Sequence, residues 1–268
     1  MRTLRVLVSG ASRLIGRETA RALLDEGCSV VMNGRDADAL ARTRTDLAAG
    51  DAGRAARLHA VAADVTDQEE ARRLVREATE ALGGLDALVN NAGISMRGRL
   101  ADLDGSVLDA IVRTNIVGAC LPTIAALPAL RASRGSVVFI SSLAGLWGFP
   151  GVSIYSASKM ALTALAQSLD AEERVNGIHV GTIYVGFTEN DDEKRILSSD
   201  GSPVRIERGA QARQGDVARQ VVRMLARRRR RIVHTPAGWA LAAVCRLAPG
   251  VLRLVLRRSA GAIHQMSR

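Results

Sequence analysis

Aromatic side chains are scarce in this 268-residue chain, where Phe, Trp and Tyr together make up 3% of the residues. Cysteine occurs only three times, at Cys28, Cys120 and Cys245, and no two of these form a Cys-x-x-Cys pair. Neither a disulfide framework nor a zinc site is therefore expected, and a reducing compartment is favoured. The four histidines are scattered as well, so no metal site is predicted. Val, Leu, Ile and Ala must fill the core.

The chain also lacks a long apolar run that is free of charge. A transmembrane helix needs about 20 mostly uncharged residues, whereas arginines such as Arg246 and Arg253 interrupt the apolar residues 236–258. A secretory signal peptide is not expected either, because the first residues lead directly into the short apolar stretch Val6–Val8. These absences predict a cytoplasmic protein, with peripheral attachment to a membrane as the open alternative.

Basic residues are concentrated towards the C-terminus. The net charge is +10, but the residues from Arg205 onward contain 15 Lys and Arg against 2 Asp and Glu, whereas residues 1–204 contain 22 against 25. Five consecutive arginines, Arg227–Arg231, form the densest part of this segment. Such asymmetry is typical of a surface that meets a membrane or a nucleic acid.

Short β-branched runs alternate with longer amphipathic stretches along the chain. This pattern predicts an α/β fold, a Rossmann-like doubly wound parallel sheet of about seven strands with helices on both faces. Ligands of such sheets bind beyond the carboxyl ends of the strands, so chemistry is expected there. The predicted strands are Val6–Ser9, Ser29–Asn33, Leu58–Ala62, Ala87–Asn90, Ser136–Ile140, Ile178–Tyr184 and Ile232–His234.

Helices are expected between these strands, and no linker divides the chain. The polar segment Glu189–Arg213 is predicted to be a long loop or lid. Residues 1–235 therefore form one predicted domain. Residues 236–268 form a basic amphipathic extension, with two short helices meeting at Pro249, rather than an independent domain. The predicted helices of the domain are Ile15–Glu26, Ala37–Ala48, one between Asp67 and Gly83, Ser106–Leu130 with a kink or break near Pro122, and Tyr155–Arg174.

The first predicted strand runs into the glycine-containing turn Ser9–Gly16. Gly10 and Gly16 allow the backbone to turn tightly and to approach a pyrophosphate. The helix that follows offers free N–H groups and the positive end of its dipole to the anion. A structural turn without any ligand remains the alternative, because glycines between a strand and a helix are common.

The end of the second predicted strand indicates which cofactor is bound. NAD-binding units carry an acidic residue about 20 residues after the glycine turn, which holds the ribose 2′-hydroxyl. Arg35 lies in this neighbourhood, and Arg13 lies in the turn itself. Two guanidinium groups suit a 2′-phosphate, so NADP(H) is predicted rather than NAD. Asp36 is the acidic competitor one residue later, and two solvated arginines are the alternative interpretation.

A serine, a tyrosine and a lysine form a second constellation. Ser142 lies at the end of the fifth strand, and Tyr155 and Lys159 are four residues apart on one face of a helix. An ammonium near a phenol favours the phenolate and lowers its pKa, so Tyr155 can exchange a proton with a substrate oxygen that Ser142 holds. Ordinary surface residues on a helix are the alternative. Ser141 is the competing serine, although its side chain should point to the opposite face.

Together these residues resemble the short-chain dehydrogenase/reductase family over about Leu4–Thr188. The resemblance implies hydride transfer between a nicotinamide and a carbonyl or alcohol carbon. In a reduction, Tyr155 would be the acid, Ser142 the carbonyl anchor, and Lys159 the residue that tunes the tyrosine and binds the ribose. Asn115 matches the asparagine that completes a proton relay through water. The residues implied to bind the cofactor are Gly10, Ser12, Arg13, Ile15, Gly16, Arg35, Asp64, Val65, Asn91, Ala92, Gly93, Tyr155, Lys159 and Thr188.

Three further segments carry the resemblance. Residues 64–65 match the adenine contact, Asn90–Gly93 match the fourth-strand motif, and Val185–Thr188 match the segment whose threonine contacts the nicotinamide end. The chain departs from the family pattern twice. Leu14 replaces the middle glycine of the turn, as in pteridine-reductase-like members, and Val185 replaces a proline without removing any chemistry.

The predicted function is an NADPH-dependent oxidoreductase, a carbonyl reductase or alcohol dehydrogenase that forms a homodimer or homotetramer. The alternative is a cofactor-binding regulatory or membrane-docking protein without turnover, for which Leu14 is the best argument. The substrate is expected to be an apolar carbonyl or alcohol compound, because apolar residues lie near the predicted site, although they can equally pack the loop. These residues are Leu143, Leu146, Trp147, Phe149 and Val152.

Three roles compete for the C-terminal residues 236–258. They can dock on the domain as a lid or subunit contact, or they can lie in an anionic membrane surface. Nucleic-acid binding is disfavoured, because aromatic side chains for base stacking are not interleaved with the arginines. We expect this segment to be helical and to bury its Leu and Val face on the protein or in lipid.

Overall fold

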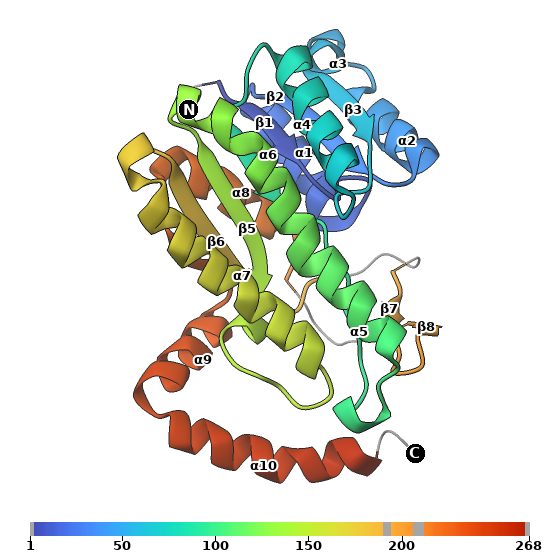
Figure 1. The fold of residues 1–268 in the computed structure, drawn as a ribbon, viewed down its shortest axis with the longest axis vertical. Coiled ribbons are helices and arrows are strands. Elements are labelled where there is room, and N and C mark those ends of the chain that lie inside the picture. Colours follow the sequence, from blue (N-terminus) through green and yellow to red (C-terminus); the bar gives the residue numbers. More distant parts are fainter. Residues whose placement is uncertain (1–2, 190–193, 206–211, 266–268) are drawn as a thin grey trace.

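The computed structural model describes residues 3–189, 194–205 and 212–265, and a seven-stranded parallel sheet lies at its centre (Figure 1). The strand order is β3-β2-β1-β4-β5-β6-β9, and each neighbouring pair is parallel. The chain builds outward from β1 in one direction and then from β4 in the other, so the predicted doubly wound sheet is confirmed. The strands are β1 (Arg5–Val8), β2 (Ser29–Gly34), β3 (Leu58–Ala62), β4 (Ala87–Asn90), β5 (Ser136–Ser142), β6 (His179–Val185) and β9 (Arg231–Val233).

Helices connect these strands, and those predicted from the sequence are present with ends shifted by three residues at most. Asp67 caps its helix as expected, because its carboxylate accepts a hydrogen bond from the Glu70 amide at 2.9 Å. The helices are α1 (Leu14–Asp25), α2 (Ala37–Ala48), α3 (Ala52–Arg57), α4 (Gln68–Leu82), α5 (Gly105–Val112), α6 (Gly118–Ser133), α7 (Ser153–Glu172), α8 (Gln214–Arg227), α9 (Pro236–Leu247) and α10 (Pro249–Gln265).

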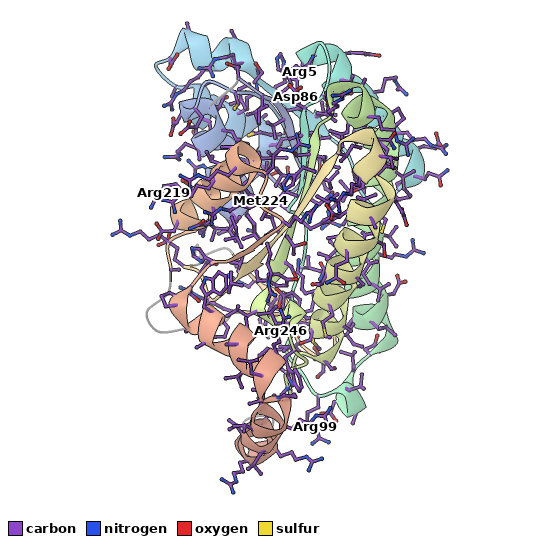
Figure 2. All side chains as sticks on the ribbon, turned by 90° about the vertical axis from the view of Figure 1, so that its left-hand side faces the viewer. Arg5, Asp86, Arg99, Arg219, Met224 and Arg246 are labelled. Carbon is purple, nitrogen blue, oxygen red and sulfur yellow. The ribbon has the colours of Figure 1, made fainter. Side chains whose placement is uncertain are left out.

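The two faces of the sheet are covered by separate layers of helices. Helices α1, α2 and α8 pack on one face, and α4, α6 and α7 pack on the other. Figure 2 illustrates the amphipathic character of α8, since Met224 points towards the sheet and Arg219 points away from it. Arg5 and Asp86 form an ion pair at 2.8 Å at the end of the molecule opposite α9 and α10.

The long helix has no break at Pro122. A π-turn, Arg113–Val117, joins α5 to α6, so the helix runs on from Gly105 to Ser133 and includes Pro122. A π-turn is one way in which a helix absorbs an irregularity, and it precedes a proline that has no N–H to donate. Within the described ranges, this is the one unbroken helix long and apolar enough to cross a membrane, yet it packs against α4 and α7.

Two helices and a pair of short strands were not predicted. Helices α3 and α8 are absent from the sequence-based assignment. The predicted loop Glu189–Arg213 contains a short antiparallel pair, β7 (Ile196–Leu197) with β8 (Pro203–Val204). Residues 190–193 and 206–211 of that segment lie outside the described residues.

Three arginines of the run Arg227–Arg231 contact other parts of the domain. Arg228 donates to the carbonyl oxygens of Arg134 at 3.0 Å and Gly177 at 2.6 Å. The guanidinium of Arg230 lies 3.3 Å from the Asp170 carboxylate, and that of Arg231 lies 5.1 Å from the centre of the Tyr184 ring. These arginines therefore fix the entry of the chain into β9.

The C-terminal extension consists of two helices, as predicted, with a bend of 114° between them. Helix α9 packs against β9. Helix α10 crosses the end of the molecule near the start of α7 (Figure 1). Gly238 of α9 is buried, and a Cβ atom there would lie 2.8 Å from both Leu143 and Val233. The first helix is thus seated closely on the domain.

Candidate active site

A cleft with a volume of about 2360 Å³ opens at the carboxyl ends of the strands, where ligands of such sheets bind. The glycine turn forms one part of its wall, β5 and α7 form the middle, and α9 forms another part. The cleft is lined by every predicted site residue except Gly16 and Asn115. The structure therefore brings the sequence-predicted residues together in one place.

Glycine is required in the turn because other backbone segments lie very close. Gly10 has φ +62°, and a Cβ atom there would lie 2.8 Å from the Cα of Ala92. A Cβ on Gly16 would lie 2.1 Å from the carbonyl oxygen of Gly10. The Asn91 side chain donates to the carbonyl oxygens of Ser9 at 3.0 Å and Gly10 at 2.9 Å. The turn is thus packed closely against the segment that follows β4.

Leu14 keeps the conformation that glycine would adopt. It begins α1 with φ +54°, in the left-handed region that costs an L-residue about 1–2 kcal/mol. The departure from the family pattern therefore strains the backbone locally but leaves the shape of the turn intact.

We expect Gly10→Ala to lower the free energy of unfolding by about 2–4 kcal/mol, since it adds a clash with Ala92 to the strain of a positive φ. Gly27→Ala is the matched control. Gly27 has φ +81°, and its added Cβ would meet nothing within 4 Å, so about 1–2 kcal/mol is expected. Urea unfolding of both variants measures the difference. Equal losses would contradict the close approach at Gly10.

Basic side chains gather at the part of the cleft beyond β2. Arg13 and Arg35 line it as expected, and Arg42 from α2 joins them, which the sequence analysis missed. Its spacing of seven residues from Arg35 was the available signal. Asp36, the acidic competitor, caps α2 by accepting a hydrogen bond from the Ala39 amide at 2.9 Å. Its carboxylate is therefore already engaged in holding the helix.

Two predicted residues close the neighbouring wall. Val65 is buried, and Asp64 turns its carboxylate to the Thr66 amide at 2.9 Å, which shapes the loop after β3. On the opposite side, Thr188 is buried and its backbone pairs with Ala212. Both segments thus place backbone and short side chains along the cleft.

Ser142, Tyr155 and Lys159 occupy the middle of the cleft. Ser142 ends β5, and its hydroxyl accepts a hydrogen bond from the Ala144 amide at 3.2 Å. Tyr155 and Lys159 lie one turn apart on α7, with the lysine Nζ 5.9 Å from the centre of the tyrosine ring. Ser141, in contrast, donates to the Lys159 carbonyl at 3.0 Å and is buried against α7. The geometry thus favours Ser142 over Ser141.

The Lys159 ammonium is suited to a polar ligand. Its side chain is buried, and burial lowers the pKa of Lys159 to about 8. Among the described residues its hydrogen-bond acceptor is the Ile140 carbonyl at 3.0 Å, which uses one of three N–H donors. A Cβ on Gly93 would lie 3.3 Å from Nζ, so glycine there leaves room beside it. Two donors thus remain for a bound ligand.

Asn115 lies behind the cleft wall instead of on it. Its side chain is fully buried in the π-turn and donates to the Ile94 carbonyl and the Ser158 hydroxyl, both at 2.9 Å. Its amide oxygen accepts from the Ile94 amide at 2.8 Å. Both N–H donors are therefore used, which makes the amide a positioning group between the segment after β4 and α7.

Helix α9 contributes wall residues that the sequence analysis did not assign to the site. Ala237 and Leu241 line the cleft, as does Leu143 after β5. The mouth also includes Arg97 and Lys194. The signal for α9 was its apolar composition together with the expected docking on the domain.

Comparisons with known proteins agree with this geometry. The short chain dehydrogenase family model matches residues 5–200. Dehydrogenase/reductase SDR family member 7B of Bos taurus is 34% identical over 95% of this chain and 81% of its own length. The 3-ketodihydrosphingosine reductase of Bos taurus is 29% identical over 81% of this chain and 67% of its own length. A solved short-chain dehydrogenase of Streptomyces avermitilis is 26% identical, with a TM-score of 0.80 over 99% of both chains.

The chain therefore belongs to the short-chain dehydrogenase/reductase family. It is an oxidoreductase that acts on alcohol or carbonyl groups with a nicotinamide cofactor and a small-molecule substrate.

Proposed function

We propose that the protein is an NADPH-dependent carbonyl reductase, or alcohol dehydrogenase in the reverse direction. The observation that carries the proposal is the meeting of Ser142, Tyr155 and Lys159 in one cleft with the glycine turn and Arg35. When bound, the nicotinamide supplies or accepts the hydride. The chain's residues position the reacting carbon and move the proton.

In the reductive direction, the Ser142 hydroxyl holds the carbonyl oxygen of the substrate, and the Tyr155 hydroxyl donates a proton to that oxygen as the new alcohol forms. The Lys159 ammonium stabilises the phenolate that remains. Asn115 holds the segment that follows β4 at a fixed position relative to the start of α7, through its hydrogen bonds to Ile94 and Ser158.

The cofactor end of the proposal rests on charge. Gly10, Ser12, Ile15 and Gly16 shape the pyrophosphate turn, and residues 91–93 close it from β4. Arg13 and Arg35 offer guanidinium groups to a 2′-phosphate, and Arg42 adds a third to the same wall. NADPH is therefore favoured over NADH.

The test is to mix the protein with NADPH and a panel of apolar ketones and to follow the loss of NADPH absorbance. Turnover supports the reductase. Saturable NADPH binding without turnover on any ketone would instead support the cofactor-binding regulatory function. An apolar substrate is favoured by Leu143, Phe149 and Leu241 in the cleft lining, and the similarity to a 3-ketodihydrosphingosine reductase supports a lipid-like carbonyl compound.

We also propose that residues 1–235 act as one catalytic domain and that the protein is a cytoplasmic homodimer or homotetramer. Exposed apolar side chains on the helices of one face support self-association, among them Leu108 and Ile124, which are 42% and 63% exposed.

The extension, residues 236–268, is proposed to dock α9 on the domain and to lay α10 on an anionic membrane surface. Asp216 is the last acidic residue of the sequence, and five arginines, at 246, 253, 257, 258 and 268, accompany the apolar residues of this segment. Apolar side chains remain exposed by half or more at Trp239, Leu247, Val251, Leu254 and Val255.

We expect the protein to sediment with vesicles that contain anionic lipid and to be released at high salt. Each arginine near an anionic surface contributes about 1 kcal/mol, and salt screens this attraction. Neutral vesicles at low and high salt are the control. A protein that stays in the supernatant in every condition would leave α10 as a lid or subunit contact.

A further inference from the structure

A second hollow lies between α10 and the start of α7, and we call it the α10 groove. Its volume is about 520 Å³. Trp147, Phe149 and Met160 line it from the domain, and Leu256 lines it from α10. The charged residues of the lining are Arg253 and Arg257, whose aliphatic stems can cover apolar surface. The groove is therefore an apolar site with basic groups and no acidic ones.

The groove adjoins the catalytic cleft. Phe149 and Pro150 line both hollows, and both belong to the loop that leads from Ser142 to Tyr155. The loop is fixed to α7, because the Phe149 amide donates to the Ser156 hydroxyl at 3.3 Å. The two hollows are therefore neighbours that share Phe149 and Pro150 as wall residues.

We propose that the α10 groove binds the hydrocarbon chain of the substrate, so that the substrate class is a long-chain ketone or related lipid carbonyl compound. The inference rests on the proposed reductase function. The apolar lining and the wall residues that the groove shares with the catalytic cleft, Phe149 and Pro150, suit a flexible chain better than a compact ring system. The groove thus makes the affinity for the substrate depend on the length of its hydrocarbon chain, while the catalytic residues act on the carbonyl group.

The first test is kinetic and uses methyl ketones of about five to about thirteen carbons with NADPH. Burying a methylene contributes about 0.8 kcal/mol, so kcat/KM should rise about three- to fourfold with each carbon that enters the groove. Ala157→Phe narrows the groove from α7 and should remove this gain for the long ketones, with the short ones changed less than twofold. Ala164→Phe lies two turns further along α7, outside the groove lining, and is the matched control.

The second test measures binding without turnover. The chain has two tryptophans, Trp147 in the groove and Trp239 on α9, so Trp239→Phe leaves Trp147 as the only reporter. A long methyl ketone brominated at its far end should quench Trp147 fluorescence in the NADP⁺-loaded protein, because heavy-atom quenching requires contact. Ala157→Phe in this background should abolish the quenching, and Ala164→Phe should not.

The outcomes separate the inference from the reductase function. Quenching of Trp147 without reduction of any ketone would retain the chain-binding groove and reject the reductase. Reduction that is independent of chain length, together with no quenching, would reject the groove and retain the reductase. If Ala157→Phe fails to fold, Leu256→Trp in the kinetic series narrows the groove from α10 instead, and equal behaviour of all variants overturns the proposal.

Discussion

Tyr155→Phe is expected to reduce kcat for ketone reduction to less than about a tenth of the wild-type value. The substitution removes the one proton that the ring can donate while keeping its size, and general acid catalysis typically contributes about 10²–10⁴-fold. The dissociation constant of NADPH should change little, since the ring remains to line the cleft. Initial rates and NADPH fluorescence titration measure the two quantities.

Tyr184→Phe is the matched control for this variant, because Tyr184 is the only other tyrosine in the chain. Its hydroxyl donates to Thr163 at 3.1 Å, and its buried side chain is not part of the cleft lining. Losing this bond should cost about 1 kcal/mol of stability and leave kcat nearly unchanged. A Tyr155→Phe enzyme with more than a tenth of the original kcat would rule out the tyrosine as the acid.

The alternating pattern was sufficient to predict the central sheet. Strands such as Leu58–Ala62 and Ala87–Asn90 have the predicted ends, because each is a short, mostly apolar run that begins directly after a charged residue, Arg57 or Asp86. Helix α8 was not predicted, although Val217, Val221 and Met224 recur at helical spacing on its buried face. The many arginines of this segment lie on the other face, so its overall composition does not resemble that of a core helix.

The residue types that form the site could be predicted from the sequence, but the burial of their side chains could not. The spacing of Tyr155 and Lys159 places both on one helix face, whereas the burial that lowers the pKa of Lys159 depends on β5 and Gly93, which are remote in sequence. The resemblance predicts Asn115 as part of a proton relay, but the sequence did not indicate that the π-turn directs its amide to Ile94. Such positions are set by tertiary packing, and no local pattern encodes them.

The basic C-terminal segment contains two groups of arginines with different surroundings. The arginine run looked like a binding surface, yet Arg228 and Arg230 bind the domain itself. The exposed combination of apolar residues and arginines lies instead on α10 and the end of α9. Composition identified the segment, while only the fold separates the structural arginines from those that can meet a partner.

Arg35→Ala is expected to reduce the preference for NADPH over NADH about ten- to hundredfold. Arg35 follows β2 and lines the cleft, and a charge-assisted hydrogen bond to a phosphate contributes about 1.5–3 kcal/mol. The loss should appear in kcat/KM for NADPH, with the value for NADH almost unchanged, since NADH has no 2′-phosphate. Arg13→Ala should act in the same direction.

Arg21→Ala separates this effect from a general loss of positive charge. Arg21 lies on α1, the helix that follows the glycine turn, and its guanidinium lies 3.5 Å from Glu18, outside the cleft lining. Because long-range attraction between exposed charges is screened by salt, this control should change the cofactor preference less than twofold at physiological ionic strength. A wild-type enzyme that prefers NADH, or an Arg21→Ala effect as large as that of Arg35→Ala, would refute the assignment of Arg35 to the 2′-phosphate.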